Sequence, residues 1–402
     1  MRMTIKRIRV DELKTGMYVH DLDCGWLQHG FLLQRFPVRN PSQIEKLLGI
    51  GLKELYIDTE RGHDVVGAPT EAEIKATLQQ QLKSTANEGA ALLPARVSQR
   101  QEAVAARHIL GEASEVVDDL LHDVRLGRQV NPTKAGPLVR EISDSVLRNP
   151  GALLSLCRIK EADTYTFKHC VSICALMVSF SSAMGMDQAT VQEAGLGGLL
   201  HDIGKMRIPN SILNKPGKLT EEEFTIMKTH APEGVDLLLK TPGLSSLTIQ
   251  IVAEHHERMG GGGYPRGLVG ERISEMGRMA AIVDVYDALT SNRVYHKGQE
   301  PTEVLRKLLE WSHTHLDGDL VQHFIRILGI YPVGTLVRLS SDRLAVVVEQ
   351  GEDLLRPTVR LVYNILHRLP IRPRDLHLQH SHDHIVDFEE PEQWGLYPAT
   401  YL

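Results

Sequence analysis

Hydrophobic residues near the N-terminus follow the short alternating pattern of a small mixed domain. Residues 5–10 and 16–19 predict short strands, because apolar side chains recur there at close intervals. Residues 42–49 begin with a capping-box sequence and predict a helix, and residues 52–57 predict a further strand. We therefore expect residues 1–65 to form a small α/β domain.

The hydrophobic spacing changes to the helical period in the middle of the chain. Leu138, Ile142 and Val146 recur every four residues, and similar spacings continue through the region that follows. The preceding stretch is rich in Ala, Glu, Gln and Lys, which is typical of an extended helical segment. The pattern thus predicts a helical linker over residues 66–134 and an all-helical domain over residues 135–330.

Beyond Pro332 the hydrophobic pattern returns to that of strands. Residues 335–339, 344–348 and 358–363 predict three of them, separated by polar or glycine-containing turns. We expect a small β-rich module over residues 331–402. The predicted fold class is therefore mainly α: a helical domain between a small mixed N-terminal domain and a small β-rich C-terminal module.

The composition of the 402 residues is that of an ordinary folded protein. Its 42% hydrophobic and 24% charged content excludes disorder as the main state. A net charge of -6 argues against general binding to nucleic-acid polymers, which requires a basic face. The four cysteines are too few for a disulfide scaffold, and no apolar run is long enough for a membrane span, so we expect a cytoplasmic protein.

Histidine and aspartate residues recur near the ends of the predicted central helices, where distant positions can converge in one bundle. Their donors are imidazole nitrogens and carboxylate oxygens without a thiolate, a set that suits Fe, Mn, Ni, Co or Zn and disfavours a structural zinc finger. Seven ligands exceed the needs of one tetrahedral ion, whereas two ions that share a carboxylate would use them well. The set is His169, His201, Asp202, His230, His255, His256 and Asp284.

Two adjacent pairs within this set allow a simpler interpretation when each is taken alone. His201 and Asp202 precede Gly204, and a solvated helix end is the usual explanation of such a pair. His255 and His256 precede a glycine-rich stretch and could end a polar helix, although consecutive helical residues point about 100° apart and could flank one ion. The recurrence of ligand residue types along the domain favours the metal site.

At residues 135–330 the sequence resembles the HD-GYP subgroup of the HD phosphohydrolase superfamily, whose members are cyclic di-GMP phosphodiesterases. The resemblance rests on the histidine and aspartate set, on Gly263-Tyr264-Pro265, on Asn214-Lys215-Pro216-Gly217 and on the stretch from Asp284 to Thr290. Residues 1–65 also resemble a small domain of unknown function that often precedes this catalytic domain. The resemblance implies metal-dependent hydrolysis of cyclic di-GMP to linear pGpG and, with further cleavage, GMP.

The resemblance also implies a role for each matching residue. His169, His201, Asp202 and Asp284 would hold one divalent ion, and Asp202 would bridge to a second ion held by His230, His255 and His256. Iron and manganese are the preferred ions, and nickel, cobalt and zinc suit the same donors. Asp202 and Lys205 are the expected catalytic residues, and Lys205, Arg293, Tyr264, His296 and Lys297 are the expected substrate contacts. Asp287 would orient a ligand histidine, although a structural cap or ion pair explains it equally well.

Four positions depart from the family pattern. Tyr165 stands where some members have a glutamate ligand for a third metal, which predicts a two-metal site. Gly260 replaces an aspartate of the glycine loop, and Val294 replaces a common proline. His296 stands at a position that often holds a lysine, and Lys297 beside it could substitute. None of these changes removes one of the seven ligands, so we expect activity.

Two other functions and one other site are open at this stage. The alternatives are an HD phosphohydrolase that acts on other nucleotides, and a non-catalytic cyclic di-GMP sensor or scaffold. In the latter the Gly-Tyr-Pro loop would dock a partner such as a diguanylate cyclase domain. Alternating histidines near the C-terminus favour a solvated loop over a further metal site; they are His377, His380, His382 and His384.

Overall fold

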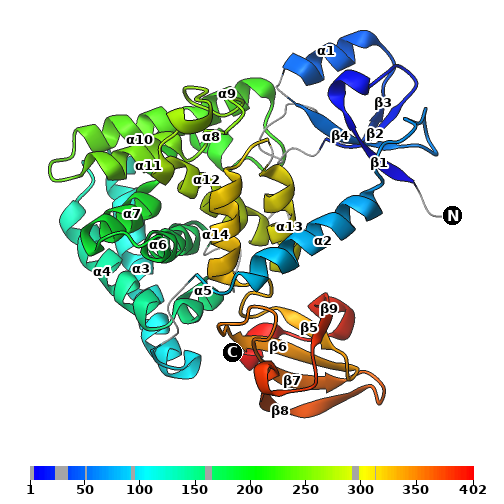
Figure 1. Cartoon of the computed structure of the whole chain (residues 1–402). Helices are drawn as coiled ribbons and strands as arrows, with labels where there is room; N and C mark the ends of the chain where they lie inside the picture. Colours follow the sequence, from blue (N-terminus) through cyan, green and yellow to red (C-terminus); the bar gives the residue numbers. More distant parts are fainter. Residues whose placement is uncertain are drawn as a thin grey trace.

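The computed structural model describes residues 4–22, 35–49, 52–91, 96–158, 165–291, 298–312 and 314–402. Figure 1 shows a helical centre with a small sheet near the N-terminus and a second sheet near the C-terminus. This arrangement confirms the predicted fold class, in which helices dominate the middle of the chain and strands its two ends.

The N-terminal part is an antiparallel sheet with one covering helix. Its strands are β1 (Ile5–Arg9), β2 (Tyr18–Asp21), β3 (Phe36–Pro37) and β4 (Glu54–Asp58), in the order β1-β4-β2-β3. Helix α1 (Pro41–Gly49) ends where the sequence predicts, but Asn40 rather than Ser42 accepts the capping hydrogen bond from the Gln43 amide. Val19, Leu47 and Ile57 are fully buried between the helix and the sheet.

Two long helices, α2 (Glu71–Asn87) and α3 (Gln99–Arg125), follow this sheet. Each begins with a capping box, in which a side-chain hydroxyl and an acidic or amide side chain three residues later satisfy free amides of the first turn. The buried residues Ala106, Ile109 and Ala113 of α3 share a core with helices of the central domain. α3 therefore packs as part of the central bundle.

The central bundle is built around α6 (Tyr165–Ala183), which contacts α7 (Gln188–Leu200) closely. Two glycines of α7, Gly195 and Gly198, allow this approach; a Cβ on Gly198 would lie 3.0 Å from the Ile173 carbonyl oxygen. The other described helices are α4 (Pro132–Arg148), α5 (Pro150–Arg158), α8 (Asn210–Leu213), α9 (Glu221–Lys228), α10 (His230–Leu239), α11 (Ser246–Glu254), α12 (Glu275–Thr290), α13 (Pro301–Trp311) and α14 (Gly318–Leu328).

The C-terminal part is a five-stranded antiparallel sheet in the order β8-β7-β6-β5-β9. Its strands are β5 (Leu336–Leu339), β6 (Arg343–Glu349), β7 (Thr358–Asn364), β8 (Leu369–His377) and β9 (Ile385–Phe388). The first three strands match the predicted ones. β8 has mostly exposed side chains and contains Pro370 and Pro373, so it lacks the apolar alternation by which a strand is recognised.

Among the helices of the described ranges, none combines the length and the hydropathy that crossing a bilayer would require.

Candidate metal centre

The histidine and aspartate residues singled out from the sequence meet in one buried cluster. In the described part of the chain they form two groups whose donor atoms lie within 4.8 Å of one another. One group comprises His169, His201 and Asp284, and the other comprises Asp202, His230, His255 and His256. All seven side chains are buried.

The ends of helices position most of these donors. α7 ends immediately before His201, α10 begins at His230, and α11 ends immediately before His255. Asp202 follows α7 in a turn that passes close to α10, and a Cβ on Gly204 would lie 2.0 Å from the His230 carbonyl oxygen. Only glycine permits this approach, which carries Asp202 to the second group of histidines.

Asp202 lies between the two groups. Its Oδ2 atom is 3.2 Å from His201 Nε2 and 3.5 Å from His169 Nε2. Its Oδ1 atom is 3.4 Å from His230 Nε2. The two carboxylate oxygens therefore face different histidine groups, which is the arrangement that a bridging ligand requires.

Backbone carbonyls set the tautomers of three histidines in the cluster. Nδ1 of His201, His230 and His255 lies 2.8, 2.7 and 2.9 Å from a carbonyl oxygen three residues earlier, so each Nδ1 donates. Their Nε2 atoms then carry lone pairs that point into the cluster. The Nε2 atoms of His230 and His255 approach to 3.5 Å, where neither has a proton to share.

Burial keeps several of these imidazoles uncharged. It lowers the pKa of His230 to about 4 and that of His255 to about 3, and it lowers the pKa of His256 well below its usual value. Burial opposes the ionisation of Asp202, but the neighbouring His201 and Lys205 outweigh it and hold the pKa of Asp202 well below its usual range. Burial lowers the pKa of His201, but the carboxylate of Asp202 outweighs burial and raises it. Neutral imidazoles and a charged carboxylate are the states that bind a divalent cation.

The donors therefore fit a metal ion. Asp202 Oδ1 is buried and accepts no hydrogen bond from the described residues. A buried carboxylate oxygen without a partner costs free energy of folding, so this oxygen needs a partner. Imidazole lone pairs lie around the same carboxylate without a donor between them. A cation would satisfy the lone pairs and the carboxylate together.

Asp287 holds one of the candidate ligands in place. Its Oδ2 atom lies 2.7 Å from His169 Nδ1, and both side chains are buried. Because Asp287 lies on the same helix as Asp284, α12 supplies both a candidate ligand and the partner of another. A carboxylate that accepts from Nδ1 fixes the tautomer of the imidazole and raises its basicity at Nε2.

We expect the Asp287→Asn substitution to weaken metal binding about 10- to 100-fold, the usual contribution of a group that orients a ligand histidine. Titration of metal-free protein with Mn²⁺ measures the change. Asp236→Asn is the matched control, because Asp236 pairs at the surface with Arg207 and Lys240. Equal Mn²⁺ affinity in the two variants would contradict the role of Asp287.

Tyr264, a predicted substrate contact, covers one side of the cluster. Its ring lies 4.6 Å from that of His256 and 6.2 Å from that of His230, measured between centroids. Glu257 holds the segment that follows, because its carboxylate accepts from the Arg266 and Leu268 amides at 2.8 Å each. The Gly-Tyr-Pro loop is thereby fixed over the histidines.

Replacing Glu257 with glutamine should loosen this loop. One side-chain oxygen cannot reproduce both buried contacts, and a lost hydrogen bond to a charged group costs about 1.5–3 kcal/mol. We expect faster hydrogen exchange at the amides of Arg266 and Leu268, measured by mass spectrometry. Glu271→Gln, at an exposed residue of the same loop, should leave this exchange unchanged. Unaltered protection in Glu257→Gln would show that the carboxylate does not hold the loop.

Of the other residues predicted from the sequence, the structure describes some and leaves others outside its described ranges. Lys205 forms an ion pair with Asp202 and is one-third exposed, at 32%. Arg293, His296 and Lys297, together with Val294, lie outside the described residues, as does the side chain of Tyr165.

Gly260 bridges to Val269 within the loop. Of the C-terminal histidines, His377 contacts Thr358 Oγ1 through its Nδ1 atom at 2.9 Å.

Two buried charged residues next to the ligands were not assigned from the sequence. Glu254 accepts from the backbone amide and the hydroxyl of Ser274, and it pairs with Arg266. Arg258 donates to the carbonyl oxygens of His255 and Glu257. The signal available in the sequence was only their position, since both flank the His255-His256 pair.

The comparisons with known proteins cover most of the chain. An HD domain family model matches residues 153–320, and a model of a domain of unknown function, DUF3391, matches residues 5–135. A Pseudomonas aeruginosa protein named cyclic di-GMP phosphodiesterase is 41% identical over 395 residues, which cover 97% of this chain and 94% of that protein.

Shorter matches fall on the same class of protein. A Vibrio cholerae cyclic di-GMP phosphodiesterase is 42% identical over 134 residues, 32% of this chain and 27% of that protein. A Vibrio cholerae 3′3′-cGAMP-specific phosphodiesterase is 34% identical over 176 residues, 44% of this chain and 41% of that protein. With a full-length relative at 41% identity, the chain belongs to the HD-domain cyclic di-GMP phosphodiesterase family, as its resemblance to the HD-GYP subgroup predicts.

Proposed function

We propose that this protein hydrolyses cyclic di-GMP with two divalent metal ions, giving linear pGpG and, by a second cleavage, GMP. The observation that carries the proposal is the position of Asp202, whose two oxygens face two different sets of imidazole nitrogens. The family supports the substrate, since the relative that matches 97% of the chain bears the name of this activity.

Each donor has a role in this proposal. His169, His201, Asp202 and Asp284 would hold one ion, and His230, His255 and His256 would hold the other together with Asp202. Iron and manganese are our preferred ions, because nitrogen and oxygen donors without thiolate suit them. When bound, the ions lower the pKa of water and neutralise charge on the phosphoryl group.

The reaction adds water across one phosphodiester. A new P–O bond forms, the bond from phosphorus to the 3′ oxygen breaks, and the 3′ oxygen takes a proton. Lys205, which pairs with Asp202 and is partly exposed, would donate to a phosphate oxygen of the substrate. The seven buried side chains and the fixed Gly-Tyr-Pro loop orient the substrate, with Tyr264 at its edge. Arg293 remains the predicted contact to the second phosphate, and His296 and Lys297 remain predicted substrate contacts.

Replacing Lys205 with methionine separates substrate binding from metal binding. We expect kcat/KM to fall about 10- to 100-fold, the effect of losing one charge-assisted hydrogen bond of about 1.5–3 kcal/mol. Metal content, measured by elemental analysis, should stay at two ions per chain. Lys215→Met is the control, because Lys215 pairs with Glu223 away from the cluster. A loss of metal in Lys205→Met would place Lys205 among the groups that maintain the site.

A panel of nucleotides tests the proposed substrate. Metal-loaded protein is incubated with cyclic di-GMP, 3′3′-cGAMP, linear pGpG and a phosphomonoester, and the products are separated by chromatography. We expect strong preference for cyclic di-GMP. Preference for 3′3′-cGAMP or for the phosphomonoester would favour an HD phosphohydrolase of other specificity. Binding of cyclic di-GMP without hydrolysis, in protein loaded with each metal, would favour the sensor.

The Gly-Tyr-Pro loop also has a side that is exposed to solvent. Val269 is 52% exposed there, and Pro265 is exposed as well. We propose this surface as the docking site for a diguanylate cyclase domain, and a cytoplasmic location for the protein, because its substrate is an intracellular second messenger.

A further inference from the structure

A cavity of about 550 Å³ lies beside the metal cluster, between the central helices and the C-terminal sheet. Its walls come from residues 89–91 after α2, from α5, α6 and α12, and from residues 349–354 after β6. This volume lies within the range of small-molecule sites in proteins, about 300–1,000 Å³. None of the residues assigned to the metal cluster lines it, except Asp287.

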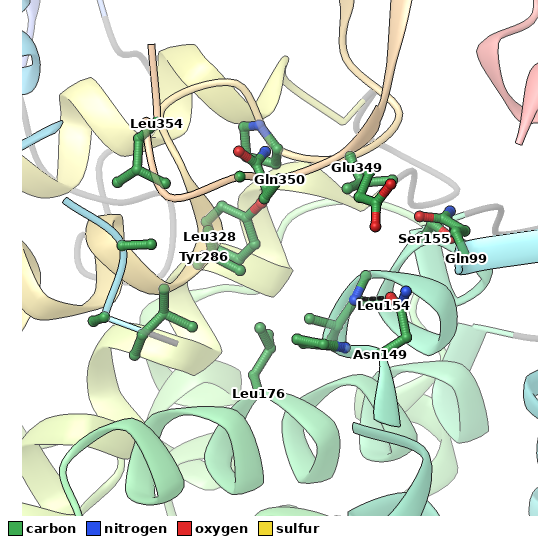
Figure 2. A pocket seen from close by; sticks show the side chains of 18 of the residues that line it. Gln99, Asn149, Leu154, Ser155, Leu176, Tyr286, Leu328, Glu349, Gln350 and Leu354 are labelled. Atoms are coloured by element: carbon green, nitrogen blue, oxygen red, sulfur yellow. Dashed lines mark hydrogen bonds between the residues drawn. The ribbon is translucent and has the colours of Figure 1, made fainter. Parts of the chain in front are cut away.

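Buried side chains form the apolar part of the wall. Leu176, Tyr286 and Leu354 line the cavity and are 2%, 4% and 1% exposed. Figure 2 shows Glu349 and Gln350 on one side of the cavity and Leu154, Asn149 and Leu176 on the other. The cavity can therefore enclose an apolar ring between two parts of the chain that are far apart in sequence.

Gln350 lines this space, but its acceptor oxygen packs against Gly329 and not against the cavity. Its Nε2 atom donates to the Tyr331 carbonyl oxygen at 2.6 Å, which fixes the orientation of the amide. Its Oε1 atom is buried and has no hydrogen-bond donor in the described part of the chain. Gly329 leaves room for the amide, since a Cβ there would lie 2.5 Å from Oε1. Gln350 therefore contributes packing to the wall, and its amide is held by Tyr331 and not by a ligand.

The charges around the cavity favour a cation. Glu349 lines it without an ion pair to any described residue, and Asp287 is a further carboxylate of the wall. The described lining residues include neither lysine nor arginine. A dinucleotide carrying two phosphates would be repelled here, so this space is unsuited to the substrate of the metal centre.

We propose that the cavity is a second ligand site, which binds a small organic cation: an amine on an apolar, ring-sized body. The amine pairs with Glu349, and the ring lies against Tyr286 and Leu176. Because Asp287 borders the cavity and also holds His169, the bound cation adjoins a group that positions a metal ligand. Binding of the cation in the cavity therefore changes the turnover of cyclic di-GMP at the metal centre.

Three probes of one shape and different charge test the ligand class on the metal-loaded full-length protein. Tryptamine is the cation, tryptophol the neutral analogue and indole-3-propionate the anion, and isothermal titration measures each. We expect one tryptamine per chain, bound about tenfold more tightly than tryptophol, as a charge-assisted hydrogen bond predicts. Indole-3-propionate should bind most weakly. Equal affinity for all three, or binding of none, would overturn the proposal.

Two carboxylate variants locate the probe. Glu349→Gln should weaken tryptamine about tenfold and leave tryptophol unchanged, because it removes the charge and keeps the shape. Glu352→Gln is the control, since Glu352 is exposed and its charge is screened by solvent. Unchanged tryptamine affinity in Glu349→Gln would contradict the site.

The Asp202→Asn variant and a turnover assay separate this site from the metal centre. Tryptamine should bind Asp202→Asn as it binds the parent protein, and loss of binding would place the probe at the metal cluster instead. Saturating tryptamine should change the turnover of the parent, and this change should be absent at the same concentration in Glu349→Gln. Saturation with unchanged turnover would overturn the coupling through Asp287.

Discussion

Replacing Asp202 with alanine is expected to abolish turnover, lowering kcat by more than about 10³-fold, because the several kcal/mol that metal ions contribute depend on this ligand. The two oxygens of Asp202 approach the two histidine groups at 3.2 Å and 3.4 Å, closer than those of Asp284, at 3.6 Å and 3.7 Å. Loss of Asp202 therefore weakens both sites at once. Elemental analysis should find metal content falling with activity.

The fold should survive this substitution, since Asp202 contributes a charged group to a polar cluster and not to the apolar core. Circular dichroism and the thermal transition of metal-free protein provide the check. Asp236→Ala, at a surface carboxylate of the same domain, is the control and should retain two ions and full turnover. An Asp202→Ala protein that keeps its turnover would refute the bridging role.

The second large effect is expected at His255. Its Nδ1 atom is held by the Val252 carbonyl oxygen, and its Nε2 atom lies 3.9 Å from Asp202 Oδ1. His255→Gln removes one ligand of the second ion and leaves His169, His201 and Asp284 untouched. We expect metal content to fall from two ions to one per chain, and kcat to fall by about 10³-fold because both ions act on the phosphoryl group.

A histidine outside the cluster gives the matched control. His323 lies on the exposed face of α14, where its Nδ1 atom contacts the Asp319 carbonyl oxygen. His323→Gln should keep both ions and full turnover. Full turnover in His255→Gln with one ion per chain would show that a single metal suffices, and the two-metal mechanism would then be wrong.

Local sequence patterns predicted the parts of the fold that depend on local spacing. The four-residue recurrence of Leu138, Ile142 and Val146 lies on the buried face of α4. Apolar alternation identified β5, β6 and β7, but β8 is exposed and contains two prolines, so no alternation marks it. Residues 66–134, predicted as a linker, contain α2 and α3, and the packing of α3 on α4 depends on contacts distant in sequence.

The residue types of the metal cluster could also be recognised from the sequence, but their relative positions could not. That Asp202 reaches His230 depends on Gly204 passing against the α10 backbone, a contact that no spacing rule contains. The partner of His169 is likewise 118 positions away, at Asp287. The cavity beside Asp287 was not predicted, because its walls join residues 89–91 to residues 349–354.

The net charge of -6 did not indicate that the proposed site binds an anionic substrate. It disfavours long-range attraction of an anionic substrate, but in the proposed site two divalent ions outweigh the charges of Asp202 and Asp284. Metal-free protein should consequently bind cyclic di-GMP much less tightly than metal-loaded protein.

Metal content and turnover measured on the same samples test the central claim most directly. Protein purified without oxygen is stripped of metal and reloaded stepwise with Mn²⁺ or Fe²⁺, and each sample is assayed for cyclic di-GMP products by chromatography. The account predicts no turnover in the stripped protein and full turnover only as the content approaches two ions per chain. Hydrolysis of cyclic di-GMP by the stripped protein would contradict it.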